Sequence, residues 1–161
     1  MKASELRVSL VQGATRWHDA AANRAYYGDL VRRLAGASDL IVLPETFLSG
    51  FTNETLGNAE SMQGESVRWI GELSREVGAV VTGSLIIQEH GTCLNRLVWA
   101  RPDGSIETYD KRHLFRMAGE HQRYGSGSKR LEVELKGWRI CPQVCYDLRF
   151  PELYRALMVP P

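Results

Sequence analysis

The sequence has little cysteine, no long apolar run and no excess of charge of one sign. Three cysteines in 161 residues are too few for a disulfide framework and favour reduced thiols in a cytoplasmic protein. No segment is long enough to span a bilayer, and the first residues, MKASELRVSLVQG, lack the apolar stretch of a signal peptide. The net charge of +1 comes with no Lys/Arg-rich run. We therefore expect neither a nucleic acid nor a membrane as the partner.

The composition that is present is that of an ordinary folded domain, with 43% hydrophobic and 24% charged residues. This length predicts one domain over residues 1–161. Leu6, Val8 and Leu10 alternate as in a half-buried strand, and a helix is expected over 19–36, between a cap at Asp19 and a stop at Gly36. A buried strand at 39–45 and a helix at 65–78 follow. This β-α-β-α order indicates a layered α/β fold.

The second half of the chain has a different pattern. Residues 79–88 and 94–111 read as consecutive strands, with turns at Gly91 and at 101–104. Two more strands are expected around Gly137, the second running through Cys145. The intervening residues 112–129 have no clean period and are rich in charge and glycine, and a loop of that length is more often functional than idle.

Cys145 has two possible interpretations. Free cysteine is commonly a buried structural residue. However, Cys145 stands where an apolar run gives way to a helix-like segment at Phe150. A strand-to-helix turn can present a nucleophile beside free backbone N–H groups, which lower a thiol pKa and bind an oxyanion. The four histidines all precede Cys145, unlike the papain-like order. We therefore expect loop, ligand-facing or core roles rather than catalysis for His18, His90, His113 and His121.

A metal site or a disulfide at Cys141 and Cys145 is not expected. If these residues lie on a strand, their sulfurs are roughly 13 Å apart. Neither a zinc ion nor a disulfide can bridge that distance.

Three charged residues stand at positions where an active site could form. Glu45 ends the apolar run LIVLPE, Lys111 ends another strand, and Glu120 lies in the long loop. Each could be an ordinary solvated or hydrogen-bonded charge. Ligand sites of α/β sheets nevertheless gather at the carboxyl ends of strands. There a glutamate could act as general base and a lysine could stabilise a tetrahedral intermediate.

Three segments together resemble the nitrilase superfamily of carbon–nitrogen hydrolases, and within it the bacterial omega-amidases. They are LPETFLSGF (43–51), YDKRHLF (109–115) and VCYDLRFPE (144–152). The resemblance implies an α-β-β-α sandwich with Cys145 as nucleophile, Glu45 as general base and Lys111 as oxyanion stabiliser, helped by the backbone N–H of Tyr146. It implies that Glu120 positions the lysine and the substrate. Arg149 is expected to anchor the turn rather than contact substrate. Phe47, Phe51 and Tyr124 could each either shape the pocket or pack in the core.

The implied reaction is amide hydrolysis through a thioester, with no metal or organic cofactor. The implied substrates are small 2-oxo-dicarboxylic monoamides such as 2-oxoglutaramate, with Arg116 or Arg149 as candidate partners of the substrate carboxylate. Members of the family continue after the cysteine motif with elements that complete the sandwich and much of a dimer interface, whereas this sequence reaches only Pro161. We therefore expect a sandwich that is incomplete at its C-terminal side, with an exposed edge and apolar face. The alternative is a non-catalytic remnant that acts as a binding module.

Overall fold

A five-stranded sheet forms the centre of the structure, a computed structural model that describes residues 5–155. The strands lie side by side in the order in which they occur along the chain. They are β1 (Val8–Leu10), β2 (Leu40–Val42), β3 (Val80–Glu89), β4 (Thr92–Ala100) and β5 (Ile106–Asp110). The first three strands are parallel, and β3, β4 and β5 are joined as antiparallel hairpins. The expected turns are confirmed, with φ 77° at Gly91 and 93° at Gly104.

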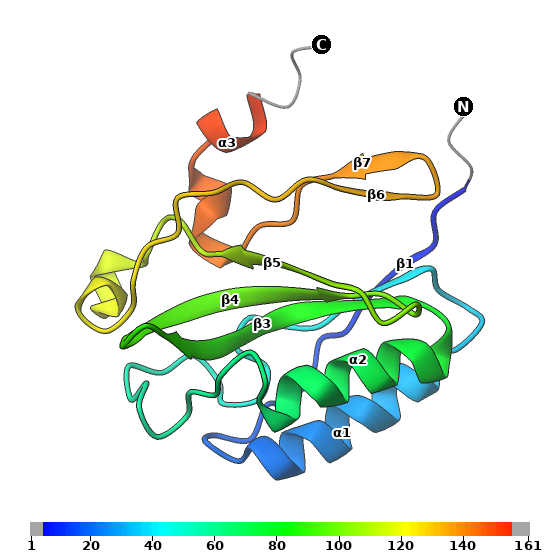
Figure 1. Cartoon of the computed structure of the whole chain (residues 1–161), viewed down its shortest axis with the longest axis horizontal. Helices are drawn as coiled ribbons and strands as arrows, with labels where there is room; N and C mark the ends of the chain where they lie inside the picture. Colours follow the sequence, from blue (N-terminus) through cyan, green and yellow to red (C-terminus); the bar gives the residue numbers. More distant parts are fainter. Residues whose placement is uncertain (1–4, 156–161) are drawn as a thin grey trace.

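Two helices cover one face of this sheet (Figure 1). Helix α1 (Ala20–Arg32) begins at the predicted cap, where the Asp19 carboxylate accepts a hydrogen bond from Ala22 N–H. It ends at Arg32, before the stop predicted at Gly36, because the chain continues through non-helical turns. Helix α2 (Glu65–Val77) buries the predicted apolar stripe, which includes Val67, Ile70 and Leu73, against the sheet.

A two-stranded ribbon covers part of the opposite face of the sheet (Figure 1). Strands β6 (Val133–Leu135) and β7 (Trp138–Ile140) form this ribbon. A second apolar cluster, which includes Leu97, Trp99 and Val133, lies between ribbon and sheet. The predicted α/β class is therefore confirmed, with helix, sheet and ribbon layers. The 3-10 helix η3 (Cys145–Arg149) and the short helix α3 (Glu152–Arg155) follow the ribbon.

The outer face of β1 differs from the prediction. Val8 and Leu10 were expected to be half-buried, but they are 48% and 77% exposed. The reason is that β1 is the edge strand and the ribbon packs on the sheet farther along, against β2 to β5.

The long loop after β5 folds against the ends of the hairpin strands. It contains the short 3-10 helices η1 (Arg116–Ala118) and η2 (Glu120–Gln122). Backbone N–H groups of Gly125 and Gly127 donate to the carbonyls of Cys93 and Lys111. A Cβ at Gly127 would lie 2.1 Å from the Asp110 carbonyl oxygen, so only glycine allows this close approach. Among the helices of residues 5–155, none is long and apolar enough to cross a membrane.

Candidate active site

Two glutamates and a lysine from distant parts of the sequence meet at one end of the sheet. Glu45 follows β2, Lys111 directly follows β5, and Glu120 opens η2. The Lys111 Nζ donates to Glu45 Oε1 at 2.7 Å and to Glu120 Oε1 at 3.1 Å. The lysine and Glu120 side chains are fully buried, whereas the Glu45 side chain is 19% exposed. The structure thus brings three of the four predicted catalytic residues into direct contact.

Asn95 completes this arrangement and was not predicted. Its side-chain amide donates to Glu45 Oε1 at 2.8 Å and to Glu120 Oε1 at 3.2 Å, the same two oxygens that Lys111 contacts. Its backbone carbonyl also accepts the N–H of Lys111. The sequence signal was an amide in the apolar strand LNRLVWA, where a polar side chain needs a buried partner.

The two carboxylates keep the lysine positively charged. Burial by itself lowers the pKa of Lys111, but the charges of Glu45 and Glu120 and their hydrogen bonds outweigh burial and raise the pKa above its usual value. Lys111 is therefore a cation and a hydrogen-bond donor in this site rather than a base.

The backbone around Glu45 is strained. The next residue, Thr46, has φ 43°, which is unusual for a β-branched side chain. Its N–H donates to Ser84 Oγ at 2.8 Å, which holds the turn in place. Residues held in such conformations cluster at functional sites.

Cys145 was predicted to lie at the end of a strand, but it is the first residue of the 3-10 helix η3. Strand β7 ends at Ile140, and residues 141–144 have no regular structure. The premise that 141–145 forms a strand was therefore wrong, because the chain leaves the ribbon earlier to reach the sheet end. Both Cys141 and Cys145 are free thiols, and no group of three or more His, Cys, Asp or Glu residues within 5–155 is placed to hold a metal ion.

The Cys145 thiol lies beside Glu45. The residue is exposed and has φ 46°, a second left-handed position in the site. Although the residue as a whole is exposed, partial shielding of the sulfur from water is the largest cause that raises the thiol pKa. The negative charge of Glu45 and the hydrogen bond between the two side chains also raise this pKa, while Lys111 lowers it. The resulting pKa is about 11. At neutral pH the group is a thiol that faces a carboxylate, which is the arrangement required for general-base activation.

Asp147 holds the turn that carries Cys145. This fully buried carboxylate accepts hydrogen bonds from the Tyr109 hydroxyl at 2.7 Å, from the His113 backbone N–H at 2.9 Å and from the Val144 backbone N–H at 3.2 Å. His113 Nδ1 also lies 2.9 Å from it. Since Tyr109 and His113 flank Lys111, Asp147 joins the lysine segment to the cysteine turn. Asp147 supplies these contacts, whereas Arg149 lines the pocket that contains Cys145, so the anchoring role expected for Arg149 stays a prediction.

Of the three aromatic residues considered as pocket walls, two lie at or beside the site and one lies in the core. Phe51 lies in the site, with Lys111 Nζ 5.6 Å from its ring centre. Tyr124 is buried beside the site and donates its hydroxyl hydrogen to the Thr52 carbonyl. Phe47 is not a pocket residue, because it is fully buried in the helix-covered core against Tyr27.

Two pockets open onto Cys145. One, of about 370 Å³, is lined by Glu45, Ser84, Gln143 and Cys145 among others. The other, of about 600 Å³, is lined by Phe115, Met117, Cys145, Tyr146, Leu148 and Arg149. The thiol is therefore accessible to a small molecule from a mainly apolar surface that carries one arginine.

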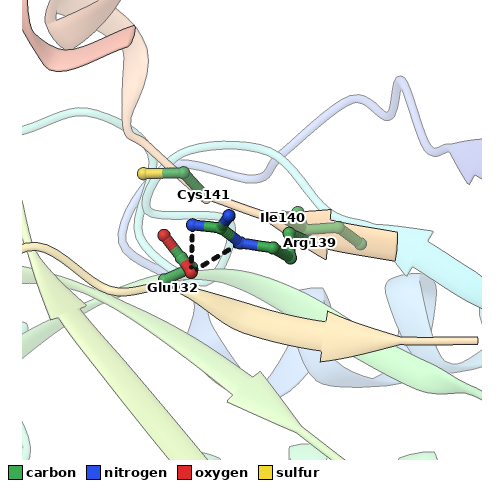
Figure 2. Close-up of a pocket in the computed structure, with 4 residues that line it drawn as sticks. All are labelled: Glu132, Arg139, Ile140 and Cys141. Atoms are coloured by element: carbon green, nitrogen blue, oxygen red, sulfur yellow. Dashed lines mark hydrogen bonds and ion pairs between the residues drawn. The ribbon is translucent and has the colours of Figure 1, made fainter. Parts of the chain in front are cut away.

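Cys141 lies in a separate, smaller pocket of about 110 Å³, which Figure 2 shows. The Glu132 carboxylate there is paired with Arg139 at 2.7 Å, and burial raises the pKa of the Cys141 thiol. The lining residues, which are Glu132, Arg139, Ile140 and Cys141, include no lysine. Its one carboxylate, Glu132, is paired with Arg139, so the pocket has no counterpart of the lysine held between two glutamates that lies beside Cys145.

A glutamate and a lysine at one end of an α/β sheet, with a cysteine beside them, form the arrangement that the three sequence motifs led us to expect. The carbon–nitrogen hydrolase family profile matches residues 7–160, and the chain belongs to this family.

Known relatives agree with this assignment. The chain is 44% identical, over 92% of its length, to the omega-amidase YafV of Yersinia enterocolitica, and 31% identical, over 73%, to a 2-oxoglutaramate amidase of Bacillus subtilis. Among solved structures, the superfamily protein XC1258 of Xanthomonas campestris, with an arsenic adduct in its active site, matches 91% of the chain at 59% identity and a TM-score of 0.89. The chain spans about half the length of these proteins, namely 57%, 47% and 56% respectively.

Proposed function

We propose that the chain carries the catalytic site of an amidase that hydrolyses the carboxamide of small 2-oxo-dicarboxylic monoamides, such as 2-oxoglutaramate. The observation that carries the proposal is the shared hydrogen bonding of Glu45, Lys111 and Glu120 beside the exposed Cys145 thiol. Family membership and the activities by which the relatives are named support it.

In the first half of the proposed reaction, the Cys145 sulfur attacks the amide carbon. The thiol proton passes to Glu45, and a C–S bond forms. The negative charge on the former carbonyl oxygen is stabilised by the Lys111 ammonium and by the backbone N–H of Tyr146. Glu45 then donates the proton to the leaving nitrogen, the C–N bond breaks, and ammonia departs from an acyl-thioester.

In the second half, Glu45 removes a proton from water, and the resulting hydroxide attacks the thioester. The C–S bond breaks, Glu45 returns the proton to the Cys145 sulfur, and the acid is released, which restores both the thiol and the Glu45 carboxylate. Asn95 keeps Glu45 in place by donating to its carboxylate, and Glu120 keeps Lys111 in place by accepting from its ammonium, through both halves.

The test is ammonia release from 2-oxoglutaramate by the 161-residue chain, with Cys145→Ala as the control. We expect release that depends on Cys145. A folded chain that releases no more ammonia than Cys145→Ala would contradict the proposal and would favour the non-catalytic binding module instead. The homo-oligomeric state and cytoplasmic location expected from the sequence stay predictions.

A further inference from the structure

Positive charge is concentrated in the loop that borders the candidate site. Residues 111–130 contain six Lys or Arg and one Asp or Glu, for a net charge of +5. The rest of the chain contains 14 Lys or Arg and 18 Asp or Glu, for a net charge of −4. A nearly neutral protein thus has a strongly basic loop at one end of its sheet.

The one acidic residue of this loop cannot neutralise its arginines. Glu120 is fully buried and bonded to Lys111, Asn95 and the backbone N–H of Phe115. Neither Arg112 nor Arg116 forms an ion pair with any carboxylate of residues 5–155. Their guanidinium groups are therefore available to a ligand.

Both arginines line one pocket of about 420 Å³, which we call the basic pocket. Its walls include His113 and His121 from the same loop, and Tyr146 and Phe150 from the segment after Cys145. No Asp or Glu belongs to this lining within the described chain. The His113 ring is fixed, because it bonds to Asp147 and stacks on Phe150 with 3.6 Å between ring centres.

The basic pocket adjoins the nucleophile. Tyr146 lines both the basic pocket and the 600 Å³ pocket that contains Cys145. Arg116 stands between Phe115 and Met117, which line the pocket of Cys145. A short molecule whose reacting carbon lies at Cys145 can therefore extend past Tyr146 toward Arg116.

We propose that the basic pocket binds the carboxylate at the far end of an anionic amide substrate, with Arg116 and Arg112 as the residues that select for this charge. This inference rests on the proposed amidase function for the reacting end only. A guanidinium group suits a carboxylate because it offers two parallel N–H donors and keeps its charge at every physiological pH.

The test compares two amides of equal chain length, 2-oxoglutaramate and the neutral pentanamide. Loss of a hydrogen bond to a charged group should reduce kcat/KM of Arg116→Gln for 2-oxoglutaramate by about 10- to 100-fold. The loss should appear mainly in KM, with pentanamide turnover unchanged, and Arg112→Gln should behave alike. Arg123→Gln is the matched control, since Arg123 belongs to the same loop but does not line the basic pocket.

Glutarate binding, measured by calorimetry, separates this inference from the proposed function. Binding that Arg116→Gln weakens and Arg123→Gln does not would support the basic pocket even if neither amide is hydrolysed. If both Arg116→Gln and Arg112→Gln hydrolyse 2-oxoglutaramate with the same preference over pentanamide as the unsubstituted chain, the inference is overturned while the amidase proposal stands. Glutarate binding that is the same in all three variants and the unsubstituted chain would also overturn it.

Discussion

Replacing Glu45 with glutamine should slow turnover and at the same time make Cys145 easier to alkylate. In the unsubstituted chain the thiol pKa is about 11, so about one molecule in a thousand carries a thiolate at pH 8. Glu45 contributes to this high pKa through its charge and its hydrogen bond, whereas Lys111 opposes it. Glutamine removes the charge and leaves the opposing lysine, so the pKa must fall.

The size of the effect follows from the causes of the shift. Burial is the largest cause and remains after the substitution, so we expect the pKa to fall by about one unit, which gives roughly tenfold more thiolate. A thiolate of lower pKa is also a weaker nucleophile, by about threefold for one unit. The net alkylation rate at pH 8 should therefore rise about three- to fourfold. Turnover should fall by about 10²- to 10⁴-fold, because the general base is lost.

The assay is iodoacetamide labelling followed by mass spectrometry of the peptides that contain Cys93, Cys141 and Cys145. In the unsubstituted chain, the labelling rate of Cys145 should rise about tenfold for each pH unit until the pH approaches 11. Glu132→Gln is the matched control, because Glu132 is a carboxylate paired with an arginine beside Cys141. It should change neither the turnover nor the labelling of Cys145.

Two results would refute this reasoning. Labelling of Cys145 that is ten times slower in Glu45→Gln would mean that Glu45 activates the resting thiol instead of raising its pKa. Full turnover of 2-oxoglutaramate by Glu45→Gln would mean that another group is the base.

Three further predictions concern residues that support the site. Asn95→Leu removes the amide that donates to both carboxylates, and kcat for 2-oxoglutaramate should fall tenfold or more with little change in KM; an unchanged kcat would exclude a positioning role. Asp147→Asn directs an amide N–H at a group of hydrogen-bond donors and should lower the free energy of unfolding by about 2–4 kcal/mol. The midpoint of thermal unfolding, followed by circular dichroism, should then fall by roughly 5–15 °C, and an equal midpoint would contradict the anchoring role. Gly127→Ala places a Cβ 2.1 Å from a carbonyl oxygen of β5, so the midpoint should fall by about 5 °C. Gly57→Ala, where no atom lies within 4 Å of the added Cβ, should leave it unchanged.

The sequence by itself determined the local elements and the types of residue in the site. The apolar stripe of α2 and the turns at Gly91 and Gly104 depend on residues that are close in the chain, so periodicity and turn chemistry were sufficient to predict them. The three motifs likewise led to Glu45, Lys111 and Cys145 before any geometry was known.

Only the tertiary structure decided which groups touch one another and which surfaces are left open. The contacts of Asn95 with Glu45 and of Tyr109 with Asp147 join residues 50 and 38 positions apart, and no local pattern encodes such a pairing. Leu10 has the alternation of a half-buried strand, yet it is exposed, because its burial depends on whether another layer covers β1. The left-handed start of η3 at Cys145 depends in the same way on the buried Asp147 beneath it. Alternation and periodicity describe one element, whereas burial, charge pairing and backbone strain at a site depend on the elements that surround it.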